Sequence, residues 1–234
     1  MQTDRDAQIV SWLAGIGAAS AEHVMGRFGM GRSWAYARLS RLTADGLLDH
    51  RRLLYRTPGL YLATAEGLRW TFSERLGVYK LGPGGFQHAW EVATVAVALH
   101  RALPGWELLS EREIRACEND QPELVASASL GELPGGRPAL HRPDLALVGP
   151  GSRCLAIEVE LSIKAPRRLQ TICRGYARAC HVDHVYYLAT PPVARAVSRA
   201  VAEVRAQEQI TVLALHDVNG LVASERGGVR DAQH

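Results

Sequence analysis

Two short apolar runs near the middle of the chain carry acidic residues, and this combination constrains the fold more than any other feature. Asp144 adjoins the first run, Leu145–Val148, and Glu158 and Glu160 lie inside the second run, Cys154–Leu161. Successive side chains of a β-strand point to opposite faces, so the two glutamates should project from one face. A buried carboxylate is costly unless a cation or hydrogen-bond donor compensates it. The pattern predicts adjacent buried strands that share a compensated acidic cluster.

Acids on neighbouring strands are a common way of holding a divalent cation, because carboxylate oxygens are hard ligands. We therefore expect Asp144, Glu158 and Glu160 to bind Mg²⁺ or Mn²⁺. Lys164, just beyond the second run, is then a candidate catalytic group that stabilises developing charge. An alternative remains open, in which the acids cap turns or pair with nearby arginines and Lys164 is a solvated residue.

The composition is that of an ordinary globular protein, since 47% of the 234 residues are hydrophobic and 22% are charged. No apolar run approaches the roughly 18 residues that cross a bilayer. The first residues are polar and acidic, unlike a secretory signal. The four cysteines show no paired spacing, which indicates reduced thiols. We expect a cytoplasmic protein with no membrane partner.

Positive charge is concentrated in the first third of the chain. Residues 1–81 contain 11 lysines and arginines against 7 acidic residues, whereas the remainder contains 16 against 17. A local basic excess of this kind is typical of a segment that contacts nucleic acid.

The same third has the pattern of three helices, a hairpin and a further helix. Helices are expected over residues 4–14, 20–28 and 32–45, with Thr3 as an N-cap. Leu47 and Leu48, a basic segment, a Pro-Gly turn and a returning apolar strand then predict a hairpin over residues 47–64.

The spacing of Leu39, Leu42, Gly46, Leu47 and Leu48 resembles the recognition helix and first wing strand of winged helix-turn-helix domains. The resemblance implies that the third helix enters the major groove of double-stranded DNA while the wing contacts phosphates. A winged helix that serves protein contacts is the alternative. The residues expected to contact DNA here are Arg32, Ser33, Tyr36, Arg41, Arg51, Arg52 and Arg56.

A Gly/Pro-rich stretch at 82–85 predicts a linker, so residues 1–81 form one expected domain and residues 86–218 a second. Residues 219–234 are expected to be a flexible tail. The second domain should alternate helices and strands around a central mixed sheet, with residues 117–140 as a loop or irregular hairpin. The fold class expected for the chain is therefore α+β.

The order of elements in the second domain, with Asp144 before a Glu-x-Glu strand, resembles the PD-(D/E)xK nuclease-like fold. The resemblance implies that Asp144 and Glu158 hold the metal and that Glu91, on the first helix, is an accessory metal-binding acid. The lysine of that family falls at Glu160, so Lys164 or Arg168 would have to supply the positive charge. Arg168 is also expected to contact DNA. An active Mg²⁺-dependent endonuclease or nickase and an inactive domain that only binds DNA, as in a transcriptional regulator, both remain open.

Four segments in the same order resemble replication-relaxation (MobC-like) proteins of bacterial plasmids and integrative elements. The resemblance covers about residues 20–215 and implies a DNA-binding role in replication, DNA relaxation or mobilisation. The partners implied are double-stranded DNA and mobilisation or replication proteins, and a homodimer is left open. The segments are LYLATAEGLR (60–69), SEREIR (110–115), RPDLALV (142–148) and EVELSIKAPRRL (158–169).

Overall fold

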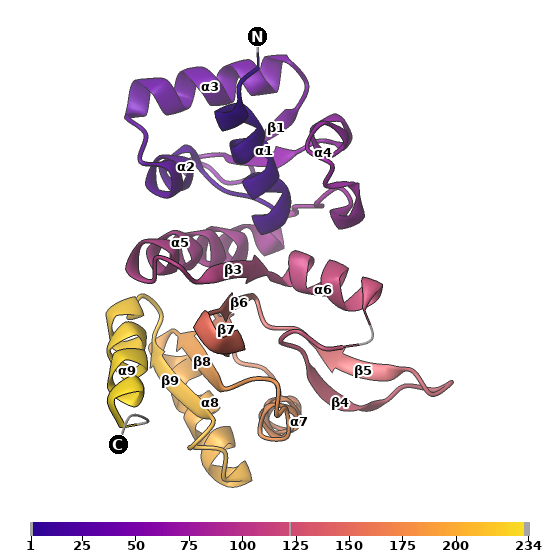
Figure 1. The fold of residues 1–234 in the computed structure, drawn as a ribbon, viewed down its shortest axis with the longest axis vertical. Coiled ribbons are helices and arrows are strands. Elements are labelled where there is room, and N and C mark those ends of the chain that lie inside the picture. Colours follow the sequence, from indigo (N-terminus) through magenta and orange to yellow (C-terminus); the bar gives the residue numbers. More distant parts are fainter. Residues whose placement is uncertain (1, 122, 232–234) are drawn as a thin grey trace. The chain divides into compact units, whose positions relative to one another are not determined.

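The structure is a computed structural model that describes residues 2–121 and 123–231 (Figure 1). The chain has the expected α+β character and divides into two compact units, Met1–Val97 and Ala98–His234. The division falls inside helix α5 (Phe86–Ala102), whereas the sequence placed it at 82–85. There, Pro83–Gly85 forms a 3-10 turn that leads directly into α5. Among the described residues, none of the helices combines the length and apolar character needed to cross a membrane.

The helices and hairpin expected in the first third of the chain are present. Thr3 caps the first helix, since its hydroxyl accepts the Asp6 backbone N–H and the Asp6 carboxylate accepts the Thr3 N–H. An isolated antiparallel bridge also joins Ala19 to Tyr61 of the hairpin. The elements are α1 (Asp4–Ile16), α2 (Ala21–Phe28), α3 (Arg32–Ala44), β1 (Leu48–Arg51), β2 (Leu60–Ala63), α4 (Ala65–Trp70) and a 3-10 turn at Glu74–Leu76.

Helix α3 is buried along one face only. Ala35, Leu39 and Leu42 recur at helical spacing and are fully buried, while most of the positions between them are exposed. The hairpin follows α3 directly, because Gly46 reverses the chain with a positive φ of 75° that a glycine adopts without strain. One face of α3 and the wing, the loop that joins β1 to β2, are therefore both left open to solvent.

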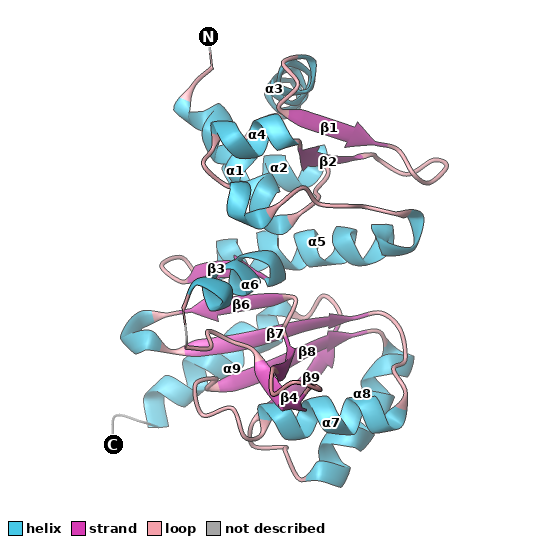
Figure 2. Ribbon diagram, turned by 90° about the vertical axis from the view of Figure 1, so that its right-hand side faces the viewer, coloured by secondary structure: helices cyan, strands magenta, loops and turns pink. Residues whose placement is uncertain are grey.

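The second unit is built on a five-stranded mixed sheet, as expected. The strand order is β3-β6-β7-β8-β9, with antiparallel pairing as far as β7 and parallel pairing beyond it. Helices α7 and α8 cover one face, where Leu169 and Ile172 of α7 and Val197 of α8 pack in one apolar cluster (Figure 2). The elements are β3 (Glu107–Ser110), β6 (Leu145–Val148), β7 (Cys154–Glu160), α7 (Pro166–Tyr176), β8 (His184–Ala189), α8 (Pro191–Val204) and β9 (Ile210–Ala214).

The region between β3 and β6 is more ordered than the sequence predicted. Helix α6 (Glu111–Asp120) begins in a capping box between Ser110 and Glu113 and buries Ile114. Of the two expectations for residues 117–140, the irregular hairpin is correct: β4 (Ala128–Glu132) pairs with β5 (Pro138–His141) with a register shift.

Most of the tail expected from residue 219 is helical, because Val218–Asp231 forms helix α9; residues 232–234 lie outside the described residues. Leu221 is fully buried. Glu225, 7% exposed, accepts hydrogen bonds from the Tyr186 hydroxyl at 2.6 Å and the Arg153 guanidinium at 2.7 Å. A buried carboxylate with two donors fixes this helix to the sheet, although its sequence is polar and rich in glycine.

His23 is enclosed in the first unit as a neutral imidazole. Its Nδ1 accepts the Ser20 backbone N–H at 3.1 Å, and its Nε2 lies 3.0 Å from Thr94 Oγ1. The Trp90 ring packs edge-on against it, with 4.8 Å between centroids. Burial is the main cause that lowers the pKa of His23 to about 4 from its ordinary 6.5.

We predict that acidification destabilises the protein through His23. The unfolded chain binds this proton near pH 6.5 and the folded chain only near pH 4, so the free energy of unfolding falls as the pH drops between those values. The full loss is about 3 kcal/mol. Urea denaturation of the wild type and of His23→Gln, at about pH 7.5 and about pH 4.5, measures it. An equal pH effect in the variant would contradict the assignment to His23.

Candidate functional site

The acids predicted to cluster on the second unit's sheet do lie together. Asp144 stands one residue before β6, whose Leu145 pairs with Ile157 of β7. Its Oδ2 accepts the Val159 backbone N–H at 2.8 Å, which places the carboxylate beside Glu158. The edge where these strands meet is therefore acidic, as the sequence indicated.

Glu158 is buried, and one of its two carboxylate oxygens accepts two hydrogen bonds from the protein. Its Oε1 accepts hydrogen bonds from the Tyr176 hydroxyl at 2.6 Å and from His141 Nε2 at 2.8 Å, and only 3% of the residue is exposed. Burial by itself would raise the pKa of this carboxyl. The charge and hydrogen bond of His141, the Tyr176 hydroxyl and the Lys164 ammonium outweigh burial and hold the pKa below its usual value.

Glu160 is neutralised by Lys164. The two side chains form an ion pair, with 7% of the Glu160 side chain exposed and 33% of the Lys164 side chain. The two glutamates of β7 share one face, and two like charges so placed repel each other unless a cation lies between them. Lys164 is that cation here, since it pairs with Glu160 and also lowers the pKa of Glu158.

The acids do not fit a metal ion as they lie. Each of Asp144, Glu158 and Glu160 already accepts a hydrogen bond or ion pair from the protein. Among the residues that the structure describes, no three His, Cys, Asp or Glu side chains are grouped so that they could hold a metal. Glu91, the expected accessory acid, belongs to the first unit, and its carboxylate accepts the Gln87 side-chain amide at 2.7 Å.

Sequence reasoning missed the two donors to Glu158. His141 and Tyr176 lie 17 and 18 residues from Glu158 and reach it only through the tertiary fold, so the local sequence pattern does not indicate either contact. Nearby arginines had been considered as partners for the acids, but Arg142 instead pairs with Glu118 at 3.2 Å. Arg168 lies exposed in the first turn of α7.

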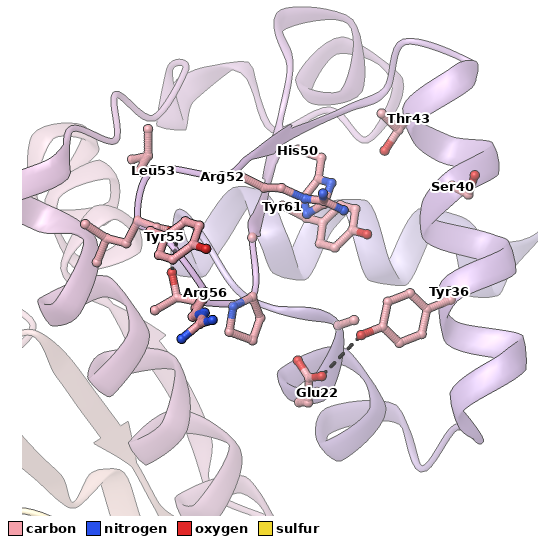
Figure 3. Close-up of a pocket in the computed structure, with 15 residues that line it drawn as sticks. Glu22, Tyr36, Ser40, Thr43, His50, Arg52, Leu53, Tyr55, Arg56 and Tyr61 are labelled. Carbon is pink, nitrogen blue, oxygen red and sulfur yellow. Dashed lines mark hydrogen bonds between the residues drawn. The ribbon is translucent and has the colours of Figure 1, made fainter.

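A hollow lies in the first unit between α3 and the wing, and we call it the α3–wing groove (Figure 3). Its volume is about 980 Å³. Figure 3 shows Tyr36 and Ser40 on the α3 side, with Tyr55 and Arg56 on the wing side. The residues that give it chemical character are Glu22, Tyr36, His50, Arg52, Tyr55, Arg56 and Tyr61.

The floor and one wall of the groove are held by defined contacts. His50 and Tyr61 face each other across the hairpin and stack with ring centroids 4.2 Å apart and planes 4° apart. A Cβ at Gly59 would collide with the His50 ring, so only glycine leaves room for this stack. The Tyr36 hydroxyl donates to the Glu22 carboxylate at 3.2 Å. Burial, and then the charge of Arg52, lower the pKa of His50.

The predicted DNA-contacting residues separate into groups. Tyr36, Arg52 and Arg56 line the α3–wing groove, and the Arg32 guanidinium lies over the Tyr36 ring at 5.4 Å. Arg51 pairs with its neighbour Asp49 at 2.6 Å. A second hollow of about 500 Å³ lies along α3, and its lining includes two more of the predicted residues, Ser33 and Arg41, together with Trp34.

Arg41 forms an ion pair with a buried acid of its own unit. The carboxylate of Asp6, which is only 1% exposed, pairs with Arg38 at 2.5 Å and with Arg41 at 3.3 Å. Burial alone would raise the pKa of Asp6, but hydrogen bonds from Thr3 and Arg38 lower it. Arg41 therefore supports the position of α3, in addition to any contact with a ligand.

Comparisons with models of protein families, with curated proteins and with solved structures found no match. Membership of the replication-relaxation family therefore remains a prediction, and so does the nuclease-like fold.

We predict that Lys164→Met lowers the free energy of unfolding by about 2 kcal/mol, because Glu160 would keep a charge without its cation. The loss is below that of a fully buried pair, since Lys164 is one-third exposed. Lys164→Arg is the matched control that keeps the charge. The double variant with Glu160→Gln should recover most of the loss, measured by urea denaturation. An unchanged free energy of unfolding in Lys164→Met would show that this ion pair does not stabilise the fold.

Proposed function

We propose that this protein binds double-stranded DNA through α3 and the wing, as a winged helix does. The observation that carries the proposal is the α3–wing groove, where the exposed face of α3 and the arginines of the wing border one hollow. A recognition helix of this kind enters the major groove and its wing lies along the phosphate backbone. The order of three helices, hairpin and helix supports the same assignment.

Charge and hydrogen-bonding groups at the groove suit a phosphodiester backbone. Arg52 and Arg56 supply positive charge, and the Ser40 hydroxyl can donate to a phosphate oxygen. The basic excess of residues 1–81 adds long-range attraction for a polyanion. A role in replication, relaxation or mobilisation of a plasmid or integrative element is part of the proposal and rests on sequence resemblance alone.

We predict that Arg52→Ala and Arg56→Ala each weaken duplex binding and make it less dependent on salt. Loss of one phosphate contact should lower the slope of log K against log salt concentration by about 1. Fluorescence anisotropy with a short labelled duplex at several salt concentrations measures this. Arg69→Ala is the matched control, because Arg69 is equally exposed but lies on α4 outside the groove. An equal effect of Arg69→Ala would remove the support for a groove-specific contact.

For the second unit we propose a nuclease-like scaffold that does not cleave DNA. Its antiparallel β3-β6-β7 arrangement followed by parallel β8 resembles the PD-(D/E)xK core, and by that resemblance Asp144 and Glu158 would be the metal ligands. Here, however, His141 and Tyr176 both bond to Oε1 of Glu158, and Lys164 forms an ion pair with Glu160. These contacts favour a stabilising role for the acids over a metal centre.

We predict that purified protein shifts supercoiled plasmid on a gel but leaves it intact with Mg²⁺ or Mn²⁺ present. The wild type, Asp144→Asn and Glu158→Gln should bind alike and differ only in stability. Metal-dependent nicking that EDTA and both substitutions abolish would contradict the scaffold and establish an endonuclease.

A further inference from the structure

The α3–wing groove has a size and lining that duplex binding alone does not require. Its volume of about 980 Å³ is at the upper end of the range for pockets that enclose small organic molecules, about 300–1,000 Å³. Three tyrosines and a histidine line it, together with two arginines and a carboxylate. Phosphate contacts need only the cationic and hydroxyl groups, so the aromatic rings call for a separate explanation.

Tyr55 is the most prominent of these rings. It lies in the wing, lines the groove and is 87% exposed, so a flat ligand can reach its ring for stacking. The Arg56 guanidinium lies 5.3 Å from the ring centroid, so it holds the ring in place and puts a positive charge beside it. Arg56 has a left-handed φ of 59°, a strained conformation for a non-glycine residue that sharpens this turn.

The opposite wall offers hydrogen-bonding groups. In Figure 3, Glu22 and Tyr36 lie across the groove from Tyr55, and the Glu22 carboxylate accepts the Tyr36 hydroxyl at 3.2 Å. A carboxylate has about four lone-pair sites, so it can accept further hydrogen bonds beside this one. A carboxylate accepts from the exocyclic amino groups of cytosine or adenine. The stacked His50–Tyr61 pair forms an apolar floor between the two walls.

We propose that the α3–wing groove holds an unpaired base of DNA, stacked on Tyr55 and faced by Glu22, with Arg52 and Arg56 beside its phosphates. A base inside a duplex shows only its edges, because its faces are covered by the neighbouring pairs. An extruded or single-stranded base exposes its face for stacking on an aromatic ring. The inference rests on the proposed function and specifies the DNA structure that this surface prefers.

Full-length protein is titrated at fixed salt into two labelled duplexes of one sequence, one perfectly paired and one with a single bulged 2-aminopurine. The wild type should bind the bulged duplex more tightly and change the fluorescence of the bulged base as it stacks. Tyr55→Ala should weaken binding of the bulged duplex on the order of tenfold, the range of one base–aromatic stack, and leave perfect-duplex binding nearly unchanged. Tyr55→Phe should keep both properties, since it retains the ring.

Phe72→Ala is the matched control, because Phe72 is 89% exposed but does not line the groove, and it should behave as the wild type. Equal affinity of the wild type for both duplexes, or an equal loss for both in Tyr55→Ala, would overturn the base site while DNA binding itself stands. Failure of the wild type to bind either duplex would overturn the proposed function and the base site together.

Discussion

Buried carboxylates that each find a donor from a distant part of the chain fix the main elements of both units. In the first unit, Asp6 of α1 holds Arg38 of α3. In the second, Glu158 of β7 holds the hydroxyl of Tyr176 at the end of α7, and Glu225 ties α9 to the sheet. A buried charge or dipole without a partner would destabilise the fold by more free energy than most single packing contacts provide. Each pair therefore specifies which helix packs where.

The sequence predicted the first unit closely because its signals are local. Thr3, Ser20 and Thr64 cap their helices, and Gly46 ends α3, so boundaries could be inferred from neighbours a few residues apart. Adjacency of Asp144 to the glutamates of β7 was also predictable, since two apolar runs joined by a short Gly-Pro-Gly turn form a hairpin.

The rest of the second unit could not be predicted in this way. Helix α6 is mostly charged and buries few residues, so its periodicity is weak. Helix α9 depends on the contacts of Glu225 with Arg153 and Tyr186, which lie 72 and 39 residues away. The donors to Glu158 are likewise fixed by tertiary structure, so the sequence could locate the acids but not show that the protein itself satisfies them. That difference separates a metal centre from a scaffold, and it is visible only in three dimensions.

The crowding at Gly59 constrains how this surface can diverge in evolution. A side chain at position 59 collides with the ring of His50, which in turn lies flat on Tyr61. Substitutions at these three positions are therefore coupled, because a larger residue at 59 requires the His50 ring to move away or to be replaced by a smaller side chain, and the stack is then lost. Positions 50, 59 and 61 should therefore be kept together or replaced together.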